Sequence, residues 1–353
     1  MVDAEARLSP SKPWVVAALG HRFESFDIER DVFNGAAEIV DGEALGLQER
    51  SDLLRRTHGV LLGSKGEIDA STIQAMPSCR VIVRYGIGVD NVDIEAATSN
   101  GIWVANVPDY CVDEVATHTA ALVLAANRRL AANFRAAGDG NWSFSAMKGV
   151  APLSQQCLGL VGFGRIGHAV ATKLAPHVGS TIAYDEWVDD QVLIEAGVTP
   201  VSLVRLVAEA DYLSIHCPLV PETRGLVSEA VLSAMKPSAW IVNTARGEII
   251  DENALVKALR GGTIAGAALD VLASEPPDAS HPLLHAANVI ITPHVAHYSD
   301  RSTQELQRRA ALAARSALEG SPPASTINPH ATQRSGNQPR THGVRFGTVG
   351  EYR

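Results

Sequence analysis

A glycine-rich segment is the first feature of this sequence that could do chemistry. Residues 162–167 read GFGRIG, follow an apolar run expected to be a strand, and precede a helical pattern over residues 168–174. In that context the first glycine permits a tight turn, the second lets backbone amides approach a pyrophosphate, and the third allows the helix to pack closely on the strand. The segment alone is weak evidence, because glycine-rich turns are common.

An acidic residue strengthens this interpretation. Asp185 follows the next apolar run, about 20 residues further on, where a carboxylate can accept hydrogen bonds from both ribose hydroxyls of an adenosine. Such an aspartate is often only a turn former, but the order strand, glycines, helix, strand and aspartate favours a dinucleotide site. Because Asp185 would repel a 2′-phosphate, the sequence predicts NAD rather than NADP.

Three polar residues follow later apolar runs and could form an acid–base site. Arg246 lies in the segment NTARG, Glu275 precedes a proline, and His294 ends the segment TPH. Taken singly, they could be a surface charge, a loop residue and a structural imidazole. The carboxyl ends of parallel strands line one crevice, so these residues can converge there. Together with the glycine loop they form a chemical set. Its guanidinium, carboxylate and imidazole could serve anion binding and proton transfer.

Two series of elements must position these residues. Short apolar runs alternate with helical patterns, which is typical of parallel sheets covered by helices. The expected strands are residues 14–19, 37–40, 59–62, 80–84 and 102–106 in the first series, and residues 157–162, 181–184, 210–216, 240–243, 266–270 and 289–292 in the second. The six runs of the second series fit a complete doubly wound nucleotide fold.

Two longer helices and a tail complete the expected organisation. Apolar residues at three- and four-residue spacing predict one long helix over residues 112–130 and another over residues 302–318. Residues 321–353 are rich in small and polar residues and hold few large apolar ones, so we expect them to be a disordered tail.

The composition excludes several classes of protein. The 353 residues include 39 acidic and 30 basic side chains, for a net charge of -9, which disfavours a general nucleic-acid binder or a protein held electrostatically on a membrane. No run approaches the roughly 20 apolar residues of a membrane span, so we expect a cytosolic protein. Cys79, Cys111, Cys157 and Cys217 include no C-x-x-C pair, and no metal site is predicted.

Several segments together resemble the D-isomer-specific 2-hydroxyacid dehydrogenase family. They are RYGIGVDNVD at residues 84–93, NTARG at 243–247, AALDV at 267–271, SEP at 274–276 and TPH at 292–294. The similarity covers residues 79–320 and is greatest to the C-terminal-binding-protein and phosphoglycerate-dehydrogenase-like branch. It implies a two-domain α/β protein, with a Rossmann NAD-binding domain over residues 109–297, a flavodoxin-like substrate domain built from residues 1–108 and 298–320, and assembly into a homodimer.

The resemblance also implies an activity. The family uses NAD to interconvert a small-molecule 2-oxo acid and a D-2-hydroxy acid. Arg246 would bind the substrate carboxylate and 2-oxo oxygen, His294 would be the general acid or base, and Glu275 would orient His294. An alternative within the same branch is a corepressor-like interaction protein that responds to NAD(H). It would act through protein partners, because no zinc finger, helix-turn-helix signature or basic domain indicates direct contact with nucleic acid.

The motif and the resemblance together assign further contacts. The expected cofactor contacts are Gly162, Gly164, Arg165, Ile166, Gly167, Asp185, Thr119, Cys217, Pro218, Thr223, Thr244, Ala245 and Asp270. The expected substrate contacts are Arg84, Tyr85, Gly86, Ile87, Gly88 and His297. Gly86 and Gly88 would aim backbone amides at the substrate carboxylate as an anion-binding nest.

His297 departs from the family pattern. It stands where the C-terminal-binding-protein branch has a tryptophan, so a smaller, titratable ring replaces an aromatic wall of the substrate pocket. We therefore expect Arg84 and His297 to favour a substrate with a second polar or anionic group, such as a hydroxypyruvate, an oxo-dicarboxylate or a phosphorus-containing acid, over a plain aliphatic acid.

Overall fold

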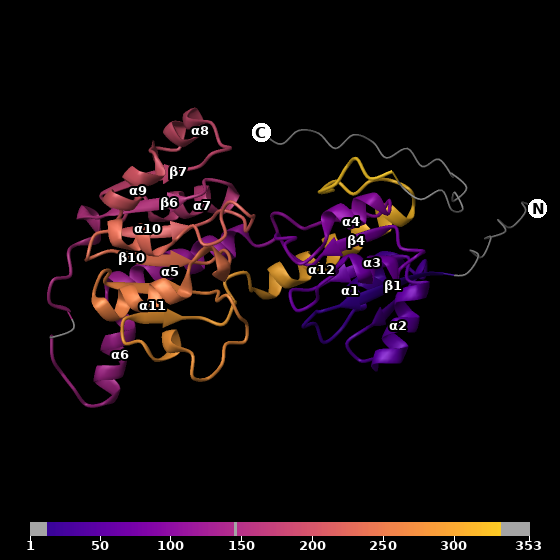
Figure 1. The fold of residues 1–353 in the computed structure, drawn as a ribbon, viewed down its shortest axis with the longest axis horizontal. Coiled ribbons are helices and arrows are strands. Elements are labelled where there is room, and N and C mark those ends of the chain that lie inside the picture. The colour runs from indigo at the N-terminus through magenta and orange to yellow at the C-terminus, as the bar shows by residue number, and fades with distance from the viewer. Residues whose placement is uncertain (1–12, 145–146, 333–353) are drawn as a thin grey trace, which may run out of the picture. The chain divides into compact units, whose positions relative to one another are not determined.

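The fold is that of a computed structural model, which describes residues 13–144 and 147–332. The chain divides into two compact units (Figure 1). Among the described residues, the first unit runs to Pro108 and resumes at Gln304, and the second runs from Asp109 to Thr303. The sequence places the domain boundaries after residues 108 and 297, and that assignment stays a prediction. None of the described helices combines the length and apolarity needed to cross a membrane.

The first unit is built on five parallel strands in the order β2-β1-β3-β4-β5, the flavodoxin-like order. Its elements are β1 (Trp14–Leu19), α1 (Asp27–Phe33), β2 (Ala37–Asp41), α2 (Leu47–Arg56), β3 (Gly59–Leu62), α3 (Ala70–Gln74), β4 (Val81–Arg84), α4 (Ile94–Ser99), β5 (Trp103–Ala105) and most of α12 (Asp300–Leu318). The inner strands β3 and β4 are buried along their whole length, as expected for a parallel sheet covered on both faces.

Part of the expected disordered tail is ordered. Asn328 accepts a hydrogen bond from the Val104 amide at 2.7 Å and donates to the Ile102 carbonyl at 2.9 Å, and the Ile327 amide donates to the Val104 carbonyl. These bonds hold residues 321–332 against the edge strand β5, so the prediction of disorder is wrong for this stretch. Residues 333–353 lie outside the described residues.

The second unit contains seven parallel strands in the order β12-β11-β10-β9-β6-β7-β8, which is the doubly wound order with one strand added. Its elements are α5 (Val112–Asn127), α6 (Leu130–Gly138), η2 (Leu153–Gln155), β6 (Cys157–Val161), α7 (Arg165–Leu174), β7 (Ser180–Tyr184), α8 (Asp190–Glu195), β8 (Thr199–Pro200), α9 (Leu203–Glu209), β9 (Tyr212–Ile215), α10 (Glu229–Ala234), β10 (Trp240–Asn243), η3 (Gly247–Ile249), α11 (Glu252–Gly261), β11 (Gly266–Leu269), η4 (Pro282–His285) and β12 (Val289–Ile291). The six strands expected from the sequence are present. β8, which takes the third place of the doubly wound order, was not expected, and β12 is the strand added to that order.

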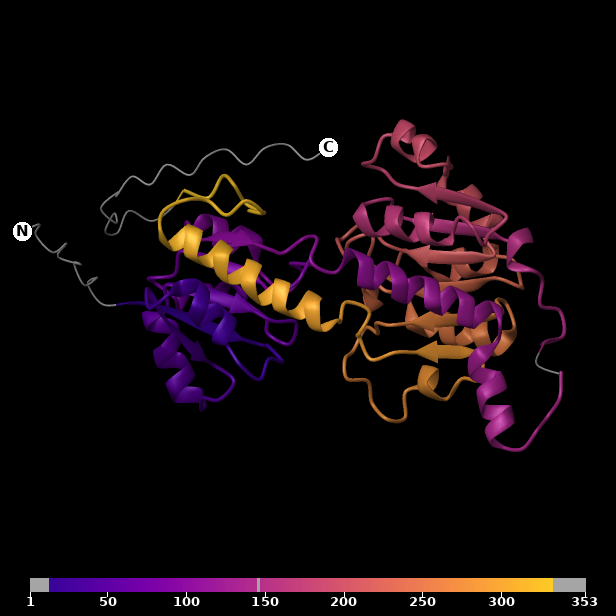
Figure 2. The same ribbon diagram turned by 180° about the vertical axis from the view of Figure 1, so that it is seen from behind.

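Two apolar cores cover the two faces of this sheet. One core packs α9, α10 and α11 on one face, and the other packs α5 and α7 on the opposite face (Figures 1 and 2). Because both faces are covered, the carboxyl ends of the strands are where loops can present polar groups to a ligand.

The expected long helix is divided in two. Helix α5 ends at Asn127, and Arg129 takes a left-handed conformation with φ 50° before α6 begins at Leu130. The Arg129 guanidinium lies 5.0 Å from the centre of the Trp240 ring, a cation–π contact that holds the chain at this break. The prediction of one helix over residues 112–130 is therefore wrong at its carboxyl end.

Candidate active site

The glycine loop joins β6 to α7 and leaves room for a ligand at one position. Gly162 has φ +94°, and a Cβ atom added there would lie 2.7 Å from the Cys217 amide nitrogen. A Cβ at Gly167 would collide with the Gly162 carbonyl oxygen, whereas a Cβ at Gly164 would meet nothing within 4 Å. The first and third glycines thus permit close packing, and the second leaves open space at the start of α7. That arrangement fits a pyrophosphate bound by a helix N-terminus.

Asp185 is fixed beside this loop. Its Oδ2 accepts a hydrogen bond from the Phe163 amide at 2.6 Å, and its Oδ1 accepts from the amides of Trp187 and Val188 at 2.8 and 3.1 Å. A carboxylate has about four acceptor positions, so one remains for a ribose hydroxyl. Asp185 therefore shapes the loop and keeps a negative charge at the expected ribose position.

His294 and Glu275 form a direct pair in the second unit. The Nδ1 atom of His294 lies 2.6 Å from Glu275 Oε2, and Glu275 Oε1 accepts from the Leu272 amide at 3.0 Å. An ionised carboxylate only accepts, so we assign the proton of this contact to Nδ1. The Nε2 atom is then the one available to a substrate. Both side chains are 27% exposed, so the pair is accessible.

The backbone of His294 is held in an uncommon conformation. Its φ is 54°, in the left-handed region, and its amide is shared between the carbonyls of Asp270 at 2.8 Å and Thr292 at 3.0 Å. The buried carboxylate of Asp270 accepts from the amides of Val295 and Ala296 at 3.0 and 2.9 Å. Asp270, expected as a cofactor contact, thus binds the segment that carries His294, a role not predicted from the sequence.

The loop of Arg246 lies next to that of Glu275. Asn243 Oδ1 accepts from the Ala245 amide at 2.9 Å, and Asn243 Nδ2 donates to the Arg246 carbonyl at 2.8 Å. A Cβ added at Gly247 would collide with the backbone of Leu272 and Ala273, so the two loops are in contact. In the sheet, β10 pairs with β11, and β11 pairs with β12. The three expected catalytic residues therefore follow three adjacent parallel strands.

Several expected cofactor contacts have internal partners. The Thr119 hydroxyl lies 2.8 Å from the Val115 carbonyl, to which it donates, and 2.9 Å from the Thr244 hydroxyl, so α5 is tied to the loop after β10. Thr223 donates to the Pro218 carbonyl at 2.6 Å and accepts from a neighbouring amide. Both threonine hydroxyls therefore make hydrogen bonds within the protein that hold the adjoining loops in place.

Cys217 also lies beside the glycine loop. It follows β9, and its amide nitrogen is the atom that a Cβ at Gly162 would meet. The side chain is buried, and burial raises the pKa of its thiol to about 11. The thiol is therefore neutral near pH 7.

His297 lies beside the imidazole of His294. The ring centres of His294 and His297 are 5.8 Å apart with nearly perpendicular ring planes, and the ring centre of Tyr110 lies 6.5 Å from that of His297. The expectation that His297 borders the substrate pocket stays a prediction. Tyr110 was not predicted, because it lies in a loop far from His297 in sequence.

The expected substrate loop lies in the first unit, after β4. Arg84 is buried and donates from Nη1 to the Tyr85 carbonyl, and a Cβ at Gly86 would collide with the Arg84 guanidinium. Gly86 has φ +151°, a conformation that side chains rarely adopt. Among the described residues, the amides of Ile87 and Gly88 donate to no backbone carbonyl, which suits an anion-binding nest.

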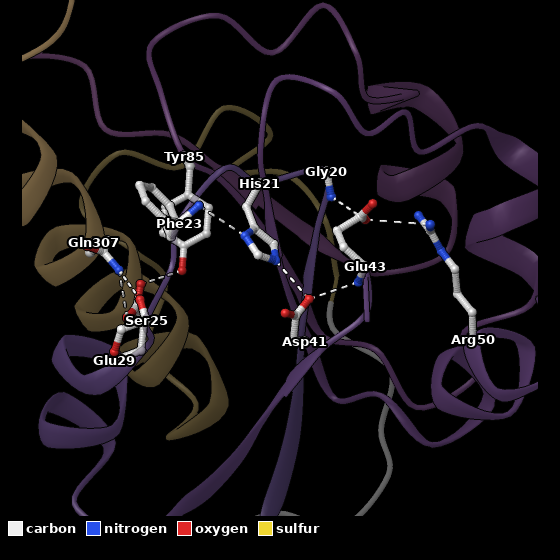
Figure 3. A network of polar contacts seen from close by, with 10 residues as sticks. All are labelled: Gly20, His21, Phe23, Ser25, Glu29, Asp41, Glu43, Arg50, Tyr85 and Gln307. Carbon is white, nitrogen blue, oxygen red and sulfur yellow. Dashed lines mark hydrogen bonds and ion pairs between the residues drawn. The ribbon is translucent and has the colours of Figure 1, made fainter. Parts of the chain in front are cut away.

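The side chain of Tyr85 does not fit the expected role of a substrate contact. Tyr85 is buried, with 4% of the residue exposed, and its hydroxyl donates to Glu29 Oε1 at 2.6 Å (Figure 3). Glu29 Oε2 also accepts a hydrogen bond from the side-chain amide of Gln307 at 3.2 Å, and burial raises the pKa of the Glu29 carboxyl. The phenol of Tyr85 is therefore part of the interior, and only its backbone can contribute to the loop.

Comparison with known proteins identifies the family of the chain. The sequence model for the D-isomer specific 2-hydroxyacid dehydrogenase NAD binding domain matches residues 120–296. The D-3-phosphoglycerate dehydrogenase of Mycobacterium tuberculosis (strain ATCC 25618 / H37Rv) is 37% identical over 307 residues, covering 86% of this chain and 53% of that protein. The chain thus spans about half the length of these curated relatives.

Two further relatives match over most of their length. The glyoxylate reductase of Thermofilum pendens is 38% identical over 291 residues, covering 79% of this chain and 84% of that protein. The structure of D-lactate dehydrogenase from Aquifex aeolicus, complexed with NAD and lactic acid, is 26% identical with a TM-score of 0.80, covering 89% of this chain and 99% of that one. These matches confirm the expected fold class and the NAD-binding domain.

Proposed function

Because the chain belongs to the D-isomer specific 2-hydroxyacid dehydrogenase family, we propose that it interconverts a 2-oxo acid and a D-2-hydroxy acid with NAD as the cofactor. The observation that carries this proposal is the 2.6 Å contact between His294 and Glu275, in a loop adjacent to that of Arg246. Ketone reduction needs a proton donor, a group that orients it and a cation that binds the acid, and these three side chains have those properties.

His294 is the proposed proton donor. Nicotinamide, when bound, supplies the hydride in reduction and accepts it in oxidation. During reduction His294 gives the Nε2 proton to the 2-oxo oxygen, and in the reverse direction it takes that proton back. Glu275 keeps the imidazole oriented through Nδ1 and stabilises its protonated form.

Arg246 is the proposed anchor of the substrate. A guanidinium is planar and presents several N–H donors, so it can bind a carboxylate oxygen and the 2-oxo oxygen in fixed directions. Binding of the 2-oxo oxygen also polarises the carbonyl, which makes it a better hydride acceptor. Lysine would retain the charge but lose this geometry, so Arg246→Lys should lower kcat/KM by at least tenfold.

The cofactor preference follows from Asp185. The open space at Gly164 and the amides at the start of α7 would hold the pyrophosphate, and the carboxylate of Asp185 would bind the ribose and repel a 2′-phosphate. We therefore expect kcat/KM to favour NADH over NADPH. Asp185→Asn should reduce that preference, whereas Glu195→Gln, which removes an exposed acidic charge from α8, should leave it unchanged.

The proposal also covers the roles of the two units, the substrate preference and the assembly of the protein. The unit from Asp109 to Thr303 would bind NAD, and the unit that contains Gly86 and Gly88 would bind the substrate carboxylate through backbone amides. His297 beside His294 supports a preference for a 2-oxo acid with a second polar or anionic group. We also propose a cytosolic homodimer, and light scattering after size-exclusion chromatography would measure its mass.

An NADH-oxidation screen over 2-oxo acids tests the proposal. The panel should contain glyoxylate, hydroxypyruvate, oxo-dicarboxylates, phosphorylated and phosphonate acids, and aliphatic acids, and chiral chromatography should identify the product. We expect turnover that forms the D-enantiomer, with best kcat/KM for an acid carrying a second polar group. Preference for aliphatic acids would contradict the role of His297, and no turnover with any acid would overturn the proposed activity and leave an NADH-responsive interaction protein to be tested by partner pull-down.

A further inference from the structure

A hydrogen-bonded chain of side chains reaches from helix α5 to the segment that carries His294. His118 Nε2 on α5 lies 2.9 Å from the Thr292 hydroxyl, and that hydroxyl lies 2.5 Å from Asp270 Oδ1. His118 Nε2 is also 3.6 Å from the same carboxylate oxygen. The Asp270 side chain is 1% exposed, and it is the group that binds the amides of Val295 and Ala296.

The protons of this chain can be assigned from the chemistry of its members. Three donors face the Asp270 carboxylate, which is the arrangement of an ionised acceptor. The Thr292 hydroxyl has one proton, and it must give that proton to Asp270. Thr292 therefore accepts its second hydrogen bond, and the donor is the Nε2 proton of His118. The chain is directed from His118 through Thr292 to Asp270.

This direction gives each member a task. The carbonyl of Asp270 accepts from the amide of His294, whose φ of 54° needs a fixed partner, and the carboxylate holds the two residues that follow His294. Without the donor from His118, the Thr292 hydroxyl could rotate, and the buried carboxylate would lose part of the polar shell that fixes it.

We propose that His118 is a positioning residue for the catalytic imidazole, acting through Thr292 and Asp270. The inference rests on the proposed role of His294 and extends it to a residue on a separate helix. His118 touches none of the reacting atoms in this scheme. Its contribution is the accuracy with which His294 Nε2 is presented to a substrate.

Kinetics of matched variants test the proposal. His118→Phe keeps a ring and removes the donor, whereas His118→Gln keeps an N–H that can reach the hydroxyl. We expect His118→Phe to lower kcat about tenfold with the Kd for NADH within twofold, and His118→Gln to recover most of the loss. His177→Phe, at an exposed histidine of the same unit, should change neither.

A double-mutant cycle separates positioning from general stability. Thr292→Val removes the hydroxyl and should match His118→Phe, while Thr292→Ser should retain activity. Because both changes break one chain, the double variant should be no slower than Thr292→Val alone. Fully additive losses, or a loss in His118→Gln equal to that in His118→Phe, would overturn the proposal.

A readout that needs no turnover keeps the proposal testable by itself. In protein labelled with nitrogen-15 histidine, the imidazole resonances of His294 should shift in His118→Phe and Thr292→Val and stay in place in His177→Phe. Unchanged His294 resonances in all three would overturn the proposal. If the wild-type protein fails to oxidise NADH with every 2-oxo acid of the panel, the proposed function is refuted instead. The spectrum does not depend on turnover.

Discussion

Replacing Glu275 by glutamine isolates the electrostatic part of catalysis. The amide can still accept a hydrogen bond from His294 Nδ1, which lies 2.6 Å from Oε2, so mainly the charge is lost. Two unit charges about 4 Å apart interact by about 4 kcal/mol at an effective dielectric constant of about 20. Both side chains are 27% exposed, so solvent screening reduces the loss to roughly 1.5 kcal/mol. That corresponds to about a tenfold fall in kcat for reduction.

The assay is kcat for 2-oxo acid reduction across a range of pH. Reduction should slow as pH rises, because His294 must carry a proton. Glu252→Gln is a matched control, because Glu252 faces another imidazole, His281, at 3.3 Å, and accepts from the Ala273 amide in the same loop. A kcat of Glu275→Gln within twofold of wild type, or equal losses in both variants, would contradict the electrostatic role of Glu275.

Three further predictions test the loop, the interior and the thiols. Gly164→Ala should fold normally, because its Cβ would meet nothing within 4 Å, and should weaken NADH binding at least tenfold. Gly162→Ala should lower the Tm, because Gly162 has φ +94° and its Cβ would lie 2.7 Å from a backbone nitrogen. Burial raises the pKa of Glu29 in the folded state, so the stability that Glu29 contributes is present at low pH and is lost as pH rises. The Tm of Glu29→Gln minus the Tm of wild type should therefore increase from about pH 5 to about pH 8. A Tm difference that stays constant would contradict this. Burial raises the thiol pKa of Cys111 to about 12 and of Cys217 to about 11, so mass spectrometry should find both alkylated far more slowly at pH 8 in folded than in unfolded protein.

The sequence predicted most of the fold because apolar runs mark strands that are buried on both faces. It missed β8, whose two residues, Thr199 and Pro200, are too short and polar to form an apolar run. It also missed the break at Arg129, because the helical spacing continues directly into α6. Residues 321–332 are ordered through hydrogen bonds of Asn328, and composition does not reveal such specific contacts.

The candidate site shows a similar division. The glycine loop, Arg246, Glu275 and His294 were predictable because each stands at a recognisable place in a motif at the end of a strand. The supporting groups were not, because the contacts of His118 with Thr292 join residues that are 174 positions apart. Tyr85 was assigned to the substrate loop from its neighbours, and only the structure reveals that its phenol binds Glu29 (Figure 3).

The role of His294 is tested most directly by the single-turnover rate of NADH oxidation by the preferred 2-oxo acid in wild type and in His294→Ala. We predict a fall of at least about a hundredfold in this rate, the size expected for loss of a general acid, with the Kd for NADH within twofold. A rate within a few-fold of wild type would contradict the assignment of His294 as the proton donor.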